Sequence, residues 1–165
     1  MNELMQDASR VISIGIGATA AMDAWALLLK RLNVPTLNFA MVGRWVGHWR
    51  RGRWAHESIA KAAPVKNELA LGWLIHYLTG VAFAALLVAI QGMAWTRNPS
   101  LLPALVVGIG TVAAPWLVMQ PAMGAGIASS KTTAPAKNRL RNLANHAVFG
   151  CGLYLAAALT ACVTR

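Results

Sequence analysis

Four of the polar residues in the long apolar stretches of this chain could form a functional site: Asp23, His76, Gln120 and His146. An Asp in a membrane-spanning helix costs about 2.5–3.5 kcal/mol on the insertion scale, so it must face a partner or water. Helical rise places Asp23 and His76 about 10 and 12 Å from one end of their stretches, and His146 about 7 Å. If those ends lie on one side of a membrane, as the charges below predict, the four residues form one polar site in that half of the membrane.

Three interpretations of this polar site follow from the residue types. An Asp–His hydrogen bond could join helices and fix their register. A proton-coupled or small-solute site is the second interpretation, because histidine titrates near pH 6.5. A metal site of His76, His146 and Asp23 is the third, since two imidazoles and a carboxylate form an open ligand set. These three residues come from separate stretches with no ligand pair one helical turn apart, so we expect no metal and no cofactor.

The apolar stretches themselves predict four membrane-spanning helices, over residues 11–29, 69–90, 101–120 and 145–163. About 20 helical residues cross a bilayer core. Hydrophobic residues make up 57% of the chain and charged residues 12%, against about 25% charged in soluble domains. We therefore expect an all-α fold, an integral membrane four-helix bundle that forms a single transmembrane domain over residues 1–165. Pro115 is interior to the third stretch and should kink that helix.

Positive charge alternates between the segments that join these stretches. From the amino terminus, the Lys and Arg counts outside the stretches are 1, 8, 1, 4 and 1. Basic loops stay on the cytoplasmic side of multi-spanning proteins. The alternation predicts a multi-pass protein of the bacterial inner membrane, with two basic cytoplasmic connectors and both termini periplasmic.

The two basic connectors cover residues 30–68 and 121–144. Basic residues beside a membrane attract anionic headgroups by about 1 kcal/mol each, so the expected partner is an anionic lipid surface. Because the charge is confined to these connectors, we expect no nucleic acid partner. The predicted headgroup contacts are Arg44, Arg50, Arg51, Arg53, Lys131, Arg139 and Arg141.

The longer connector contains a helical pattern of its own. Leu37, Met41 and Trp45 recur every four residues, which predicts an interfacial amphipathic helix between the first and second spans. The tryptophans of this connector are typical of the aromatic belt at a membrane surface. We interpret His48 and His56 as interfacial residues rather than ligands.

Small residues recur at four-residue spacing along the predicted spans. Lipid provides no hydrophobic drive between helices, so such stripes are expected to mark helix contacts. A path through only four helices would need more than one copy of the chain, which makes a homo-oligomer a candidate assembly. The small residues of the stripes include Gly15, Gly72, Gly80, Gly108 and Gly150.

Several short segments occur in a familiar order. They are residues 15–25 (GIGATAAMDAW), 43–48 (GRWVGH), 72–77 (GWLIHY), 120–126 (QPAMGAG) and 145–150 (NHAVFG). In this order the chain resembles a bacterial family of small inner-membrane proteins catalogued only as a domain of unknown function. The resemblance covers nearly the whole chain and implies four spans with no established activity, so it assigns no catalytic residue.

No catalytic motif is present in the sequence, which favours a protein that is not an enzyme. We expect an inner-membrane protein with an Asp/His polar site in its cytoplasmic half. Proton-linked or small-solute transport is the leading specific hypothesis. The alternative is a non-enzymatic scaffold or accessory subunit in which the polar residues are structural.

Overall fold

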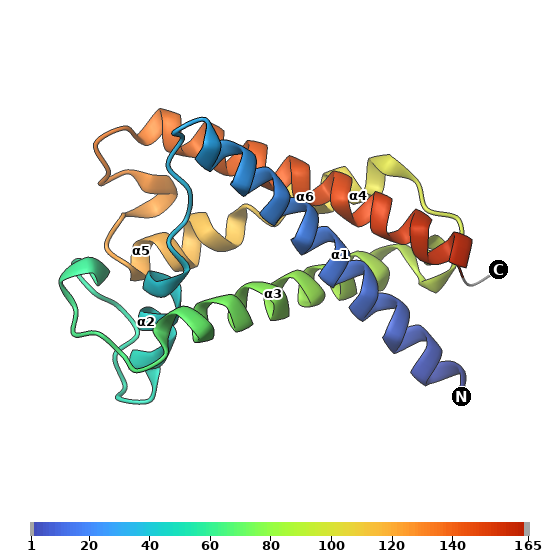
Figure 1. Cartoon of the computed structure of the whole chain (residues 1–165), viewed down its shortest axis with the longest axis horizontal. Helices are drawn as coiled ribbons and strands as arrows, with labels where there is room; N and C mark the ends of the chain where they lie inside the picture. The colour runs from blue at the N-terminus through green and yellow to red at the C-terminus, as the bar shows by residue number, and fades with distance from the viewer. Residues whose placement is uncertain (1, 164–165) are drawn as a thin grey trace. The chain divides into compact units, whose positions relative to one another are not determined.

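The computed structural model describes residues 2–163, whose regular elements are all helices, with no strand among them. Four segments are long and apolar enough to cross a membrane: α1 (Glu3–Arg31), α3 (Glu68–Gln91), Leu101–Ala122 and α6 (Pro135–Val163). Figure 1 colours them along the chain, from blue for α1 to red for α6. The all-α class and the four predicted spans are confirmed, and the chain is a multi-pass membrane protein.

The described chain divides into two compact units. The first comprises Met1–Pro35, Tyr77–Thr111 and Ala144–Arg165, and the second comprises Thr36–His76 and Val112–Leu143. Residues 1, 164 and 165 lie outside the described part, and with them Arg165, the last residue in the charge series. Because α3 and α6 each contribute residues to both units, neither unit is a continuous segment of the chain. The single transmembrane domain stays a prediction.

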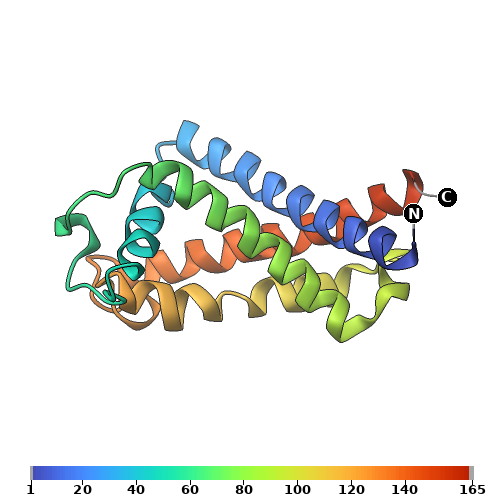
Figure 2. The same cartoon turned by 90° about the horizontal axis from the view of Figure 1, so that it is seen from below.

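The first unit has an apolar core built from α1, α4 (Leu101–Gly110) and the portions of α3 and α6 that belong to it. Ile14, Leu87 and Leu153 are fully buried. The rings of Phe83 and Phe149 meet edge-on with centroids 6.1 Å apart. In two perpendicular views, the first turn of α1 and the last turn of α6 lie at the same end of this unit (Figures 1 and 2).

Glycines bring helix backbones into contact within the first unit. A Cβ added to Gly15 would lie 2.5 Å from the Cα of Val81, so α1 and α3 are in backbone contact there. A Cβ on Gly108 would meet the backbone of Gly150, which joins α4 to α6 in the same way. The prediction that small-residue stripes mark helix contacts is confirmed at these positions.

Three of the predicted spans differ from the helices. α1 begins at Glu3, eight residues before the predicted span. α6 begins at Pro135, ten residues before the predicted span, because its first turns are polar and hydropathy does not detect them. The third span is irregular: α4 ends at Gly110, and Pro115–Met119 (η3) forms a π-helical turn before the short helix α5 (Gln120–Ala122). Pro115 cannot donate a backbone hydrogen bond, so this break has the cause predicted for it.

The second unit contains α2 (Phe39–Trp49), η1 (Ile59–Lys61) and η4 (Ile127–Ser129). The predicted connector helix is therefore present, and the Asn38 side chain caps it by accepting from the backbone N–H of Ala40 at 3.0 Å. A Cβ on Gly72 would meet the carbonyl oxygen of Phe39. Gly72 thus brings the start of α3 against α2, rather than against another span.

Three tryptophans form a cluster in this connector. Trp45 and Trp49 belong to α2, and Trp45 Nε1 donates to the carbonyl oxygen of Trp54 at 2.8 Å. The rings of Trp49 and Trp54 stack with centroids 5.0 Å apart, and Trp45 meets Trp49 edge-on at 4.9 Å. The segment after α2 therefore folds back over the helix.

Candidate functional site

Asp23 is hydrogen-bonded within the first unit. The hydroxyl of Tyr77 donates to Asp23 Oδ2 at 2.8 Å, and this bond joins α1 to α3. A hydrogen bond to an ionised carboxylate is stronger than one between neutral groups. The costly Asp of the first span therefore has a specific partner in a neighbouring span. Sequence reasoning missed Tyr77, although it directly follows His76.

His146 joins α6 to α4. Its side chain is 9% exposed, and its Nδ1 lies 3.0 Å from the hydroxyl of Thr111 and 3.2 Å from the carbonyl oxygen of Gly108. The hydroxyl of Thr111 donates to that same carbonyl at 2.6 Å. Because a carbonyl only accepts, Nδ1 is the nitrogen that carries the hydrogen in the neutral ring.

A third bond links α1 to α6, where Trp25 Nε1 donates to Asn145 Oδ1 at 3.0 Å. The three links together connect α3 to α1, α1 to α6 and α6 to α4. We call them the polar belt: Asp23–Tyr77, Trp25–Asn145 and His146–Thr111. Every long helix of the first unit is thus tied to another by a polar side chain.

His76 and Gln120, the other two predicted site residues, belong to the second unit. The His76 ring lies 4.4 Å from that of Phe39, between centroids. Gln120 Oε1 accepts from the hydroxyl of Ser129 at 3.1 Å. The two predicted residues of the first unit, Asp23 and His146, are part of the polar belt. A single site formed by all four predicted residues stays a prediction. Among residues 2–163, no three His, Cys, Asp or Glu side chains group as metal ligands.

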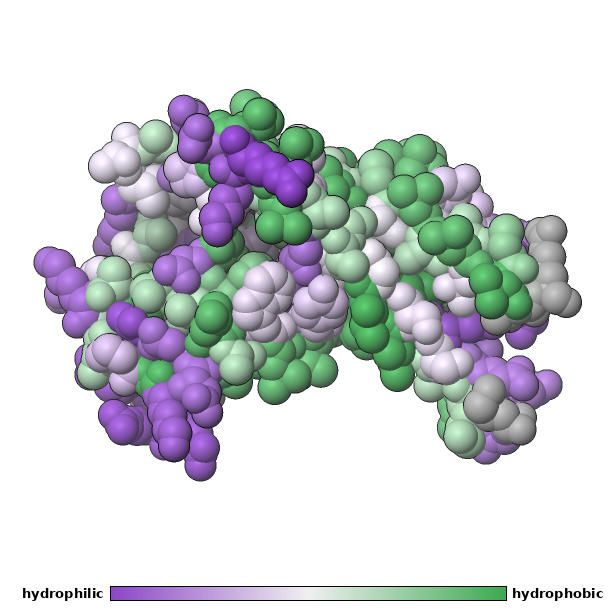
Figure 3. All heavy atoms as spheres, in the orientation of Figure 1, coloured by the Kyte–Doolittle hydropathy of each residue, from purple (hydrophilic) through white to green (hydrophobic). Residues whose placement is uncertain are grey.

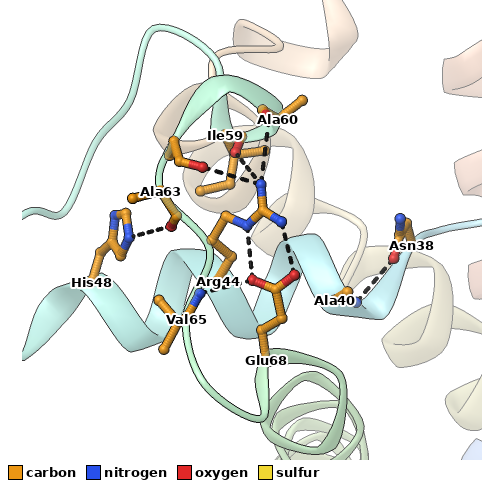
Figure 4. Close-up of polar contacts among 10 residues, drawn as sticks. Asn38, Ala40, Arg44, His48, Ile59, Ala60, Ala63, Val65 and Glu68 are labelled. Atoms are coloured by element: carbon orange, nitrogen blue, oxygen red, sulfur yellow. Dashed lines mark hydrogen bonds and ion pairs between the residues drawn. The ribbon is translucent and has the colours of Figure 1, made fainter.

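Arg44 holds the connector together rather than facing solvent (Figure 4). Its Nε and Nη2 each donate to Glu68 at 2.8 Å. Its Nη1 makes longer bonds of 3.2–3.4 Å to the carbonyls of Ile59, Ala60 and Ala62. The hydrogen bond to Glu68 raises the pKa of Arg44 above its usual value, although burial opposes this. The prediction that Arg44 contacts lipid headgroups is wrong, because its residue is 8% exposed and its donors are occupied.

The other predicted headgroup residues have different surroundings. Arg50, Arg51 and Arg53 are exposed in the connector that follows α2, and Figure 3 shows hydrophilic residues gathered over this connector. Lys131 is also exposed, and Arg139 is exposed while its Nε donates to the carbonyl of Ala128 at 2.8 Å. Contact of these residues and the half-buried Arg141 with headgroups stays a prediction.

His48 and His56 form a buried pair in the second unit. They are 2% and 8% exposed, and His48 Nδ1 lies 2.7 Å from His56 Nε2. They are buried within the protein, and their position at a membrane interface stays a prediction. Burial lowers the pKa of His56 below its usual 6.5, and the charges of His48 and Arg53 lower it further, although the backbone of Ala122 opposes this. No pattern in the sequence indicates this pair, because the two residues are brought together only when the connector folds back.

One family matches the sequence across both units. It is described as "Protein of unknown function (DUF2938)", and the match covers residues 12–160. The chain belongs to this family. No curated protein and no solved structure matches the chain. Membership in the DUF2938 family confirms the resemblance seen in the sequence, and it assigns no role to any residue of the polar belt.

Proposed function

We propose that this protein moves a small solute together with a proton across the bacterial inner membrane. The observation that carries the proposal is the hydrogen bond between Asp23 and Tyr77 inside membrane-spanning helices. An ionisable side chain within a span is costly and commonly belongs to a proton relay or a solute path. Protonation of Asp23 would turn its carboxylate from an acceptor into a donor, which changes what the site can bind.

Helix adhesion alone does not require a carboxylate. The Trp25–Asn145 bond joins α1 to α6 with two neutral side chains. Asp costs about 2.5–3.5 kcal/mol in the middle of a span. A neutral partner at residue 23 would link α1 to α3 at lower cost, so the presence of a carboxylate favours a functional role.

The proposed orientation places the two basic connectors in the cytoplasm and both termini in the periplasm. The alternation of Lys and Arg counts supports it. The position of the ends of α1 and α6 at one end of the first unit is consistent with an even number of spans. In this orientation the exposed Arg50, Arg51 and Arg53 face the anionic headgroups of the inner leaflet.

We include a homo-oligomer in the proposal. Four helices form a small bundle, and the long helices carry exposed apolar side chains such as Leu27, Leu74 and Leu159. Lipid or a second copy of the chain would cover these residues. A path between copies would give a solute more room than the filled core of one bundle.

Flux measurements in vesicles test the proposal. Protein would be reconstituted into vesicles that contain a pH-sensitive dye, and a pH gradient would be imposed with mixtures of amino acids, sugars or organic acids outside. We expect one mixture to speed the decay of the gradient in wild type. In Asp23→Asn the decay should return to the rate of protein-free vesicles.

The matched control is Asp7→Asn, which makes the same chemical change in the first turns of α1, outside the predicted span. It should retain the wild-type rate. Decay that no mixture accelerates, or equal rates in wild type and Asp23→Asn, would overturn transport through this site.

A scaffold or accessory subunit is the second candidate function. The observation that favours it is the backbone contact of α1 with α3 at Gly15 and of α4 with α6 at Gly108. Such contacts make a rigid bundle. If Asp23→Asn retains the wild-type fold and shows no change in any flux, the polar belt acts as helix adhesion and the scaffold is favoured.

A further inference from the structure

The hydrogen-bond directions at the His48–His56 pair follow from its partners. His48 Nε2 lies 3.0 Å from the carbonyl oxygen of Ala63, which only accepts, so this nitrogen carries a hydrogen. In neutral His48 the Nδ1 is then bare. It accepts the hydrogen of His56 Nε2, 2.7 Å away. Neutral His56 therefore has no hydrogen on its own Nδ1.

The Nδ1 of His56 decides what a further proton would do. Three ring hydrogens must then be shared among four nitrogens. One stays on His48 Nε2 and one stays between the rings, so the third must sit on His56 Nδ1, whichever ring bears the charge. That atom is buried and makes no hydrogen bond among the described residues. The carbonyl of Ala122, which favours the charged form of His56, already accepts from the backbone N–H of His56. A buried N–H of a charged ring without an acceptor is strongly unfavourable.

The cations near the pair further disfavour the binding of a proton by the docked pair. Arg53 lies close enough to repel a charged His56. Arg44 lies one turn before His48 on α2 and is held at Glu68. Lys61 of η1 is exposed.

The carboxylates near the pair do not stabilise a protonated pair. Glu68 Oε1 accepts from Arg44 Nη2, and Glu68 Oε2 accepts from Arg44 Nε and from the backbone N–H of Val65. Glu57 follows His56 in the chain but is exposed. The turn at residues 120–124, which packs against the connector, has no titratable side chain.

The same segment attaches the connector to that turn. The backbone N–H of His56 donates to the carbonyl of Ala122 at 2.8 Å, and that of Ile59 donates to Met123 at 3.1 Å. Gly124 has a φ of +91° and lies against backbone carbonyls of the connector, where a Cβ would not fit. The histidine pair thus stands at the point where the connector is docked.

We propose that His48 and His56 form a proton-binding site, which holds the connector docked on the 120–124 turn when neutral and releases it when one further proton binds. The ligand is a single proton, taken up at His56 Nδ1 once that nitrogen reaches water. This goes beyond the proposed transport function and does not depend on it. A neutral pair is favoured above the usual histidine pKa of 6.5. As the pH falls below that value, the undocked connector binds a proton that the docked one excludes, so docking weakens.

Hydrogen exchange tests the proposal on the whole protein in lipid nanodiscs. The protection factors of the backbone amides of residues 56 and 59, corrected for intrinsic exchange, would be compared at about pH 7.5 and about pH 5. An open histidine is almost fully protonated at the lower pH. Protection should fall by up to about 30-fold there, if the docked pair takes up no proton.

The decisive variant is His56→Gln, whose amide can still donate to His48 but cannot bind a proton. It should have equal protection at both pH values. His76→Gln, in the same unit but outside the pair, should keep the wild-type fall. Wild-type protection that does not change with pH would overturn the proposal, as would a fall that persists in His56→Gln. If His56→Gln does not fold, His76→Gln decides the outcome. A fall in protection that His76→Gln keeps supports the proposal, and a fall that His76→Gln loses overturns it.

Discussion

At the scale of single residues, Arg44 organises the segment between α2 and α3, which has little regular structure. One guanidinium meets the carboxylate of Glu68 with two nitrogens and turns the third toward carbonyls of η1. A planar guanidinium suits this task, because its donors spread in a fixed fork that an ammonium lacks. The segment from α2 to α3 thereby gains a fixed path, although η1 is a helix of one turn.

We expect Arg44→Ala to lower the free energy of unfolding by about 3 kcal/mol, because it leaves the carboxylate of Glu68 half-buried without its partner. Arg44→Lys should recover only part of this loss. Thermal unfolding in mild detergent would measure both. Arg51→Ala removes an exposed Arg from the same connector and should change stability by less than about 0.5 kcal/mol. Equal effects at the two positions would contradict the structural role of Arg44.

At the scale of helices, the close approaches in the first unit replace the hydrophobic drive that lipid does not provide. At Gly15 the neighbouring atoms belong to the backbone of α3, which cannot rotate away as a side chain could. Dispersion and interhelical hydrogen bonds then act at short range. The Asp23–Tyr77 bond lies two turns further along the same pair of helices, so glycine contact and polar link support each other.

Gly15→Ala should therefore destabilise the protein by about 1–3 kcal/mol, as overpacking does in a filled core. Gly110→Ala provides the control, since a Cβ there meets nothing within 4 Å. It should be neutral or slightly stabilising, because alanine favours the helix. Unfolding temperatures in detergent compare the two. Similar losses at both positions would mean that α1 and α3 are not in backbone contact.

At the scale of the whole molecule, charge and apolar length act together. Backbone groups in a bilayer must be satisfied within each span, so every stretch of about 20 apolar residues has one structural solution, a helix. Basic residues between the stretches then favour one of the two orientations. The proposed arrangement has Asn98 in the periplasm and Ala55 in the cytoplasm.

Cysteine labelling would check this orientation. In a background with Cys151→Ser and Cys162→Ser, a membrane-impermeant maleimide should label Asn98→Cys in intact cells. Ala55→Cys should react only after the membrane is made permeable. Both positions are exposed, so burial does not limit either reaction. The reverse pattern would place the basic connectors outside the inner membrane and invert the proposed topology.

The elements that the sequence predicted best depend on local properties. Apolar length determines the four spans, and Pro115 interrupts its span because it lacks an N–H wherever it stands. The contacts at Gly15 and Gly108 were also predictable, since small residues mark helix contacts in lipid.

The partners within the site depend on folding and were not predictable. Trp25 and Asn145 are 120 residues apart, and Asp23 and Tyr77 are 54 apart. The sequence does not indicate which carboxylate a tyrosine within a span will contact. The burial of Arg44 was also not predictable. Basic residues near a membrane are usually at its surface, and the partners of Arg44 meet it only in the folded chain.

The stacked rings of Trp49 and Trp54 have a consequence for optical spectroscopy. Two indoles whose centroids are 5.0 Å apart at an interplanar angle of 29° couple their electronic transitions, and Trp45 adds a third ring edge-on. Such coupling gives a paired positive and negative band in far-ultraviolet circular dichroism, distinct from the helix signal. Because the stack exists only while residue 54 is folded back over α2, the chain contains its own chromophoric reporter of that loop, which needs no attached dye.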